Sequence, residues 1–277
     1  MAVRSAGRVQ GADRAAVNGA ARLGTPAEPP VIPLLEELQD RVQWLAIRMI
    51  HEANVVRPSR DGVKVGGHQA SSASVITILT ELYFRWLRRG DLIAVKPHAS
   101  PAFHAIQYLM GNLDRSYLTR LREFGGLQSY PSRTKDPDPV DFSTGSVGLG
   151  AVAPLFASLA DRYLNHHFAE QVAKWPDRRF VALVGDAELD EGSSHEAIAV
   201  APRMGLDALT VIAIDNQSST LMWPGGIARR FEIEGWSAAT VDGRDHAAIE
   251  DALTAPQTGE AHPHRPRAVV AVVEKKQ

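Results

Sequence analysis

The chain has 277 residues, of which 44% are hydrophobic, and 30 basic against 32 acidic side chains give a formal net charge of −2. This length and composition suit one large α/β domain, and the balanced charge gives no basic footprint for nucleic acid. The absence of cysteine excludes disulfides, thiolate metal sites and thiol nucleophiles. Since there is also no membrane-spanning apolar run and no signal-peptide core near Met1, we expect a cytoplasmic protein without a membrane partner.

Residues 1–30 predict a flexible N-terminal arm. They are rich in Ala, Gly and Arg, contain few large apolar side chains, and close with Pro29-Pro30. We therefore place the folded domain at residues 31–277. Its first predicted element is a helix from Leu34 to about Val55, where apolar residues recur at helical spacing.

Gly66-Gly67-His68 forms a glycine-rich entry to a second predicted helix, which begins near Ser72. The free N–H groups at the start of that helix would face the loop. A histidine in such a loop is more often a local cap or a surface group than a catalytic residue. His68 is therefore a weak candidate when it is considered alone.

A second histidine, His98, follows a predicted buried strand at Asp91–Val95 and precedes another predicted helix. Ser100 is the predicted cap of this helix. His104, one turn further along it, has no motif partner and is predicted to be an ordinary helix residue.

Two further segments could place groups beside a ligand. Tyr130, within the sequence GGLQSYP, is either a half-buried core tyrosine or a phenol that hydrogen-bonds a reaction intermediate. The sequence FSTGSVGLG, which begins at Phe142, contains glycines that permit a close approach of backbone to ligand. It precedes a long amphipathic helix that is predicted to run to about His166.

The stretch from Val181 to Ser219 predicts a strand–helix–strand unit. The runs Phe180–Val184 and Leu209–Ile214 are short, apolar and β-rich, and the segment from Ser194 to about Arg203 has helical spacing. Two buried parallel strands joined by a crossover helix follow from this pattern.

The polar residues that end these strands indicate a cation site. Gly185-Asp186 stops the first strand and Asp215-Asn216 stops the second. Ligands of such units lie beyond the carboxyl ends of the strands, where Asp186 and Asn216 both fall. Their hard oxygen atoms suit Mg²⁺ that also binds diphosphate and water. On spacing alone, two strand-ending turns are the simpler interpretation.

The C-terminal part of the chain completes the predicted domain. Residues 228–253 predict a strand and a helix, and Ala268–Val273 predicts a final buried strand.

Taken in order, these motifs resemble the transketolase superfamily of thiamine-diphosphate enzymes, whose signature is Gly-Asp-Gly followed some thirty residues later by Asn. Asn216 follows Asp186 by 30 positions. The sequences GGHQAS, HASP, SYP and GDAELDEG resemble the homodimeric bacterial type of pyruvate dehydrogenase decarboxylating component, whereas EGSSHEA, IDN and RRFEIEGW resemble transketolase. The resemblance extends from about Leu34 to Val273. Ala187 and Pro97 depart from it, because the family usually has Gly at both positions.

The resemblance implies a doubly wound, mainly parallel α/β sheet with helices on both faces, which binds thiamine diphosphate and Mg²⁺. It assigns the metal to Asp186, Asn216 and the Ser218 carbonyl. It assigns catalytic roles around the reacting carbon to His68, His98 and Tyr130. The implied cofactor contacts are His68, His98, Ser146, Val147, Gly148, Gly185, Asp186, Ala187, Glu188 and Asn216.

The resemblance also implies a partner, because full-length members continue into a pyrimidine-binding domain with an activating glutamate. No residue of this chain matches that glutamate. We expect a diphosphate-binding subunit of a split, heteromeric α₂β₂ enzyme that transfers a two-carbon acyl or ketol unit. Tyr130 favours a 2-oxo acid donor such as pyruvate, since transketolases have histidine there. The alternatives are a subunit of a ketose-phosphate transketolase and, because of Ala187 and Pro97, a non-catalytic regulatory paralogue.

Overall fold

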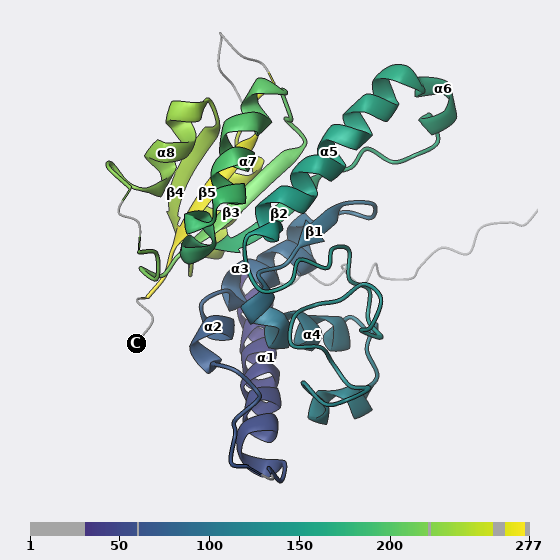
Figure 1. Cartoon of the computed structure of the whole chain (residues 1–277), viewed down its shortest axis with the longest axis vertical. Coiled ribbons are helices and arrows are strands. Elements are labelled where there is room, and N and C mark those ends of the chain that lie inside the picture. The colour runs from purple at the N-terminus through teal and green to yellow at the C-terminus, as the bar shows by residue number, and fades with distance from the viewer. Residues whose placement is uncertain (1–30, 60, 221–222, 257–263, 275–277) are drawn as a thin grey trace, which may run out of the picture. The chain divides into compact units, whose positions relative to one another are not determined.

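The computed structural model describes residues 31–59, 61–220, 223–256 and 264–274 (Figure 1). The predicted N-terminal arm, residues 1–30, lies outside the described residues. Residues 31–277 form one compact unit. No helix among the described residues is both long enough and apolar enough to span a membrane.

A five-stranded parallel sheet forms the centre of this unit, in the order β1-β2-β3-β5-β4. Each strand has β-branched and small apolar residues, and β2 is buried along its whole length, as expected of a parallel sheet covered on both faces. The strands are β1 (Leu92–Ala94), β2 (Phe180–Gly185), β3 (Leu209–Asp215), β4 (Ser237–Asp242) and β5 (Arg267–Val272).

Helices cover both faces of the sheet (Figure 1). Because side chains alternate along a strand, Val181 and Leu183 of β2 face one core cluster while Ala182 and Val184 face the other. The first cluster includes residues of α1 (Val31–His51), α3 (Ile76–Glu81), α4 (Ser100–Leu109) and α9 (His246–Thr254). The second includes residues of α5 (Leu149–His167), α7 (Gly192–Arg203) and α8 (Ile227–Glu234). The predicted α/β class, the parallel sheet and the two helical layers are confirmed.

Several predicted boundaries were wrong. α1 ends at His51 and continues only as a π-helical turn, Glu52–Val56. The helix predicted from Ser72 is two helices, α2 (Gln69–Ala73) and α3, and a second π-helical turn, Leu82–Trp86, follows α3. Ser100 is the first helical residue of α4 rather than its cap, and its hydroxyl donates to the Ser129 carbonyl at 3.2 Å.

The C-terminal segment contains one more helix than predicted. α8 precedes β4, and α9 follows β4. Gly235, at φ 105°, ends α8 in a left-handed conformation that glycine adopts easily. The chain then turns so that Trp236 packs edge-on against Phe231, with ring centroids 5.0 Å apart. The short helix α6 (Ala169–Val172) was not predicted.

Candidate functional site

The carboxyl ends of β2 and β3 bring Asp186 and Asn216 together. Gly185 pairs with Ile214 across the two strands, so the residues that follow the strands leave the sheet at the same edge. Both side chains are buried, with exposed fractions of 2% for Asp186 and 3% for Asn216. The sequence-predicted pair therefore lies in one buried place rather than on two separate surface turns.

A turn after β3 connects the two side chains. One oxygen of Asp186, Oδ2, accepts the backbone N–H of Ser218 at 2.6 Å and that of Ser219 at 3.1 Å. The Ser218 hydroxyl donates to Asn216 Oδ1 at 2.5 Å. Gln217 makes the turn with a left-handed φ of 57°. Asp186, Asn216 and Ser218, the three residues expected to hold a metal, thus form one hydrogen-bonded cluster.

This donor set fits Mg²⁺. It offers a carboxylate and an amide oxygen, which are hard ligands, beside the backbone of the following turn. Within the described part of the chain, Asp186 forms no salt bridge, so its charge is buried without a cationic side chain bonded to it. A bound cation would balance that charge.

Glu188 joins the end of β2 to the neighbouring glycine-rich loop. It lies in the 3₁₀ turn Asp186–Asp190, it is 3% exposed, and its Oε1 accepts the Gly185 N–H at 3.0 Å. Burial raises the pKa of Glu188 to about 7, although the Gly185 N–H, the Lys96 ammonium and the Gly148 N–H each oppose the rise. Gly185 is packed closely here, since a Cβ would lie 2.8 Å from Lys96 Cε. Sequence reasoning missed Lys96, whose only signal is its place just beyond β1.

Two other predicted cofactor contacts lie in the loop before α5. Gly148 caps α5 at φ 88°, and the Ser193 hydroxyl donates to its carbonyl at 3.1 Å. Ser146 and Val147 are exposed. Ala187 is also exposed, and its backbone N–H donates to Asp186 Oδ1 at 2.9 Å.

His98 and Tyr130 lie together, although 32 positions separate them in the sequence. Their ring centroids are 5.4 Å apart and the rings are nearly perpendicular. His98 comes from the 3₁₀ turn Pro97–Ala99 after β1, and Tyr130 from the long loop that precedes α5. Both are half-buried, so an imidazole and a phenol remain accessible to a ligand.

His68 is not joined to that pair in the structure. It is exposed and precedes α2, and among the described residues no hydrogen bond or ring contact links it to His98 or Tyr130. The helix that it precedes, α2, nevertheless lines a cavity of about 710 Å³ together with Asn216. That cavity is lined by Gln43, Ala70, Ala73, Ser74, Thr77, Asn216, Gly243, Arg244, Val273 and Glu274.

Comparison with known proteins identifies the family of the chain. Residues 38–271 match the family model described as the transketolase, thiamine diphosphate binding domain. Ferredoxin fas2 of Rhodococcoides fascians is 34% identical over 219 residues, which are 75% of this chain and 67% of that protein. The pyruvate dehydrogenase E1 component of Escherichia coli is 31% identical over 196 residues, which are 68% of this chain and 21% of that protein. The chain thus spans about a fifth of that E1 component.

Solved transketolases share the fold. The enzyme from Campylobacter jejuni superposes with a TM-score of 0.71 at 24% identity, over 87% of this chain and 37% of that one. The enzyme from Leishmania mexicana gives a TM-score of 0.72 at 19% identity, over 86% of this chain and 36% of that one. With the family match across most of its length, the chain belongs to the transketolase family of thiamine-diphosphate-binding domains.

Proposed function

We propose that this chain binds Mg²⁺ and thiamine diphosphate at the carboxyl ends of β2 and β3, as the diphosphate-binding subunit of a heteromeric two-carbon transferase. The observation that carries the proposal is the buried pair of Asp186 and Asn216, in a chain of this family. Its cysteine-free composition favours a cytoplasmic location.

The residues of the site divide into a metal-binding group and a diphosphate-binding group. Asp186, Asn216 and the Ser218 carbonyl would hold Mg²⁺. The backbone of Gly185 and Ala187 would lie beside the phosphate oxygens, with the Gly185 N–H held by Glu188 Oε1 and the Ala187 N–H by Asp186 Oδ1. The backbone of residues 146–148 would contact the aminopyrimidine ring.

The opposite end of the cofactor would face the histidine and tyrosine side chains. Thiamine diphosphate, when bound, supplies an electron sink that lets a bond beside a carbonyl group break. The carbonyl oxygen of the donor substrate would accept hydrogen bonds from His68, His98 and Tyr130. The two imidazoles would also hold or release a proton there. The contact between the His98 and Tyr130 rings supports their shared role.

We also propose that a second polypeptide supplies the pyrimidine-binding domain and the activating glutamate, in an α₂β₂ assembly. Two observations support this. The match to this chain covers 67% of ferredoxin fas2 but 21% of the E. coli E1 component. Ferredoxin fas2 is therefore a much shorter relative, with less room for further domains, as a separate subunit would be. In addition, α5 exposes large apolar side chains, with Phe156 60% and Tyr163 54% exposed, which is typical of a surface that another subunit covers.

The identity of Tyr130 supports a 2-oxo acid such as pyruvate as the donor. The SYP motif, through which the sequence resembles pyruvate dehydrogenase components, contains Tyr130, whereas the transketolase-like segments, residues 191–197 and 228–236, lie mainly in α7 and α8. The residues at the reacting end are the better guide to the donor substrate, because they would contact it.

Reconstitution with the protein encoded by the neighbouring reading frame tests this function. The assembly is incubated with thiamine diphosphate and Mg²⁺, and with either pyruvate or xylulose 5-phosphate. Cofactor-dependent CO₂ release from pyruvate, absent with either subunit alone, is the expected result. Glyceraldehyde 3-phosphate from the sugar alone would instead indicate a ketose-phosphate transketolase, and cofactor binding without turnover of either substrate would indicate the regulatory paralogue.

A further inference from the structure

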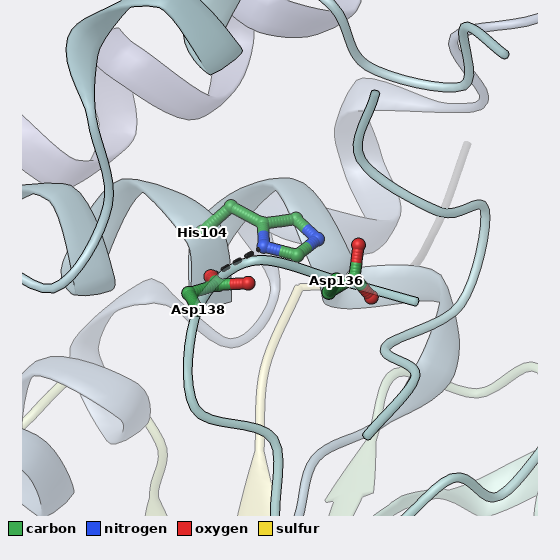
Figure 2. Close-up of side chains that lie close together, drawn as sticks. All are labelled: His104, Asp136 and Asp138. Atoms are coloured by element: carbon green, nitrogen blue, oxygen red, sulfur yellow. Dashed lines mark hydrogen bonds and ion pairs between the residues drawn. The ribbon is translucent and has the colours of Figure 1, made fainter. Parts of the chain in front are cut away.

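One imidazole and two carboxylates form a buried cluster that has no role in the proposed cofactor site. His104 comes from α4, and Asp136 and Asp138 come from the long loop that carries Tyr130 (Figure 2). One potential ligand atom from each side chain lies within 4.8 Å of those from the other two. His104 is fully buried, Asp138 is 4% exposed and Asp136 is half-buried, so the cluster is not a patch of surface acids.

The imidazole of His104 lies between the two carboxylates, as Figure 2 shows. Its Nδ1 is 2.7 Å from Asp138 Oδ2. Its other nitrogen, Nε2, and the other oxygen of Asp138, Oδ1, are buried without a hydrogen-bond partner among the described residues. Buried polar atoms of this kind are costly unless a further ligand satisfies them.

The surroundings of the cluster carry negative charge. Within the described residues, the salt bridge of Asp138 is to His104 and neither Lys nor Arg joins it. Burial, followed by the charges of Asp141 and Asp138, raises the pKa of the nearby Tyr83 phenol well above its ordinary value. Two carboxylates, one buried and one half-buried, lie beside this imidazole without a Lys or Arg bonded to Asp138, which favours a bound cation.

We propose that His104, Asp136 and Asp138 bind a first-row divalent metal ion, with Zn²⁺ as the best match. Imidazole nitrogen and carboxylate oxygen are the ligands that Zn²⁺ accepts, and water would complete a tetrahedron. Ligand atoms about 2.1 Å from a tetrahedral Zn²⁺ lie about 3.4 Å apart. Ligand atoms that are now up to 4.8 Å apart therefore need to close by as much as about 1.4 Å.

The existing hydrogen bonds of Asp136 leave room for coordination. Its two oxygens accept the backbone N–H groups of Gln128, at 2.8 Å, and Ser132, at 2.7 Å. Each carboxylate oxygen has two lone-pair sites, so an oxygen can accept an N–H and still bind a metal ion. The bonds to Gln128 and Ser132 also fix Asp136 as a ligand.

A metal ion here would fasten the Tyr130 loop to α4. Asp136 bonds to residues on both sides of Tyr130, and His104 lies six positions after His98. The proposed ion would therefore hold the contact between His98 and Tyr130, as a structural metal distinct from the proposed Mg²⁺.

Metal titration of the full-length chain tests the proposal. The wild type, His104→Gln and Asp138→Asn are treated with chelator and then titrated with Zn²⁺. Excess Mg²⁺ is present throughout, so that it occupies the proposed oxygen site at Asp186. His167→Gln is the matched control, because the exposed rings of His166 and His167, 4.7 Å apart, are the competing surface site. Bound Zn²⁺ is quantified by mass spectrometry, and its ligands are identified by X-ray absorption at the zinc edge.

One equivalent of Zn²⁺ in the wild type and the control, with one imidazole and carboxylate oxygens as ligands, is the expected result. The two cluster variants should bind Zn²⁺ at least about 100-fold more weakly than the wild type. Mutating residues that only hydrogen-bond to metal ligands already lowers metal affinity 10–100-fold. The proposal is overturned if the wild type binds no Zn²⁺. Equal binding by His104→Gln, or a spectrum without a single imidazole ligand, overturns it as well, and the wild-type spectrum decides even if the variants do not fold.

Discussion

Replacing Glu188 by Gln should change how the stability of the metal-free chain depends on pH. The wild-type carboxyl is buried at the end of β2, and burial raises its pKa from the ordinary 4.5 to about 7. Glutamine has nearly the same shape, and its amide oxygen can still accept the Gly185 N–H that Oε1 accepts at 3.0 Å. The variant therefore removes the ionisation and keeps the hydrogen bond.

The direction follows from the raised pKa. The folded state favours the protonated carboxyl, so its stabilising contribution is complete below pH 4.5 and is lost as the pH rises through about 7. The two pKa values differ by about 2.5, and each pKa unit corresponds to about 1.4 kcal/mol, so the loss amounts to about 3 kcal/mol at pH 8. The free energy of unfolding of Glu188→Gln, relative to that of the wild type, should therefore rise by about 3 kcal/mol between pH 4.5 and pH 8.

Urea denaturation of both proteins from pH 4.5 to 8, in a chelating buffer without cofactor, measures this difference. Glu196→Gln, at an exposed position of α7, is the control, and it should show no comparable trend. If the difference between Glu188→Gln and wild type stays constant across the pH range, Glu188 ionises normally in the fold and its raised pKa is contradicted.

Two further substitutions test the core and the cofactor loop. Phe231→Ala should lower the free energy of unfolding by about 3–5 kcal/mol, because the ring is fully buried against Trp236; an unchanged urea midpoint would contradict this packing. Ala187→Gly should tighten Mg²⁺-dependent thiamine diphosphate binding by the reconstituted assembly several-fold, because it removes a methyl group where the phosphates would approach; an equal Kd, measured by calorimetry, would show that the methyl group does not hinder them.

The main strands could be predicted because their signals are local. Phe180–Val184 and Leu209–Ile214 are apolar runs that end at polar turn residues, and both form buried strands of the parallel sheet. The juxtaposition of Asp186 and Asn216 then follows from strand pairing alone. That His98 and Tyr130 lie in one region was expected only from the resemblance, since no local pattern relates them.

The remaining features depend on tertiary contacts. Neither the division between α2 and α3 nor the π-helical turns are marked by Gly or Pro, so the sequence pattern reads as continuous helices. His104 and Asp138 are 34 positions apart, and His246 meets Glu81 across 165 positions. Pairs at such separations leave no periodicity, so the prediction of His104 as a helix residue, which α4 confirms, gave no sign of its contact with Asp138.

The proposed function requires that thiamine diphosphate binds through a metal held at the carboxyl ends of β2 and β3. Calorimetric titration of the reconstituted assembly with thiamine diphosphate and Mg²⁺ tests it most directly, with the wild type compared with Asp186→Ala and Asn216→Ala. We predict that Asp186→Ala abolishes Mg²⁺-dependent binding and that Asn216→Ala weakens it less severely, because a charged ligand contributes more than a neutral one. Wild-type affinity in both variants would contradict the assignment of this site.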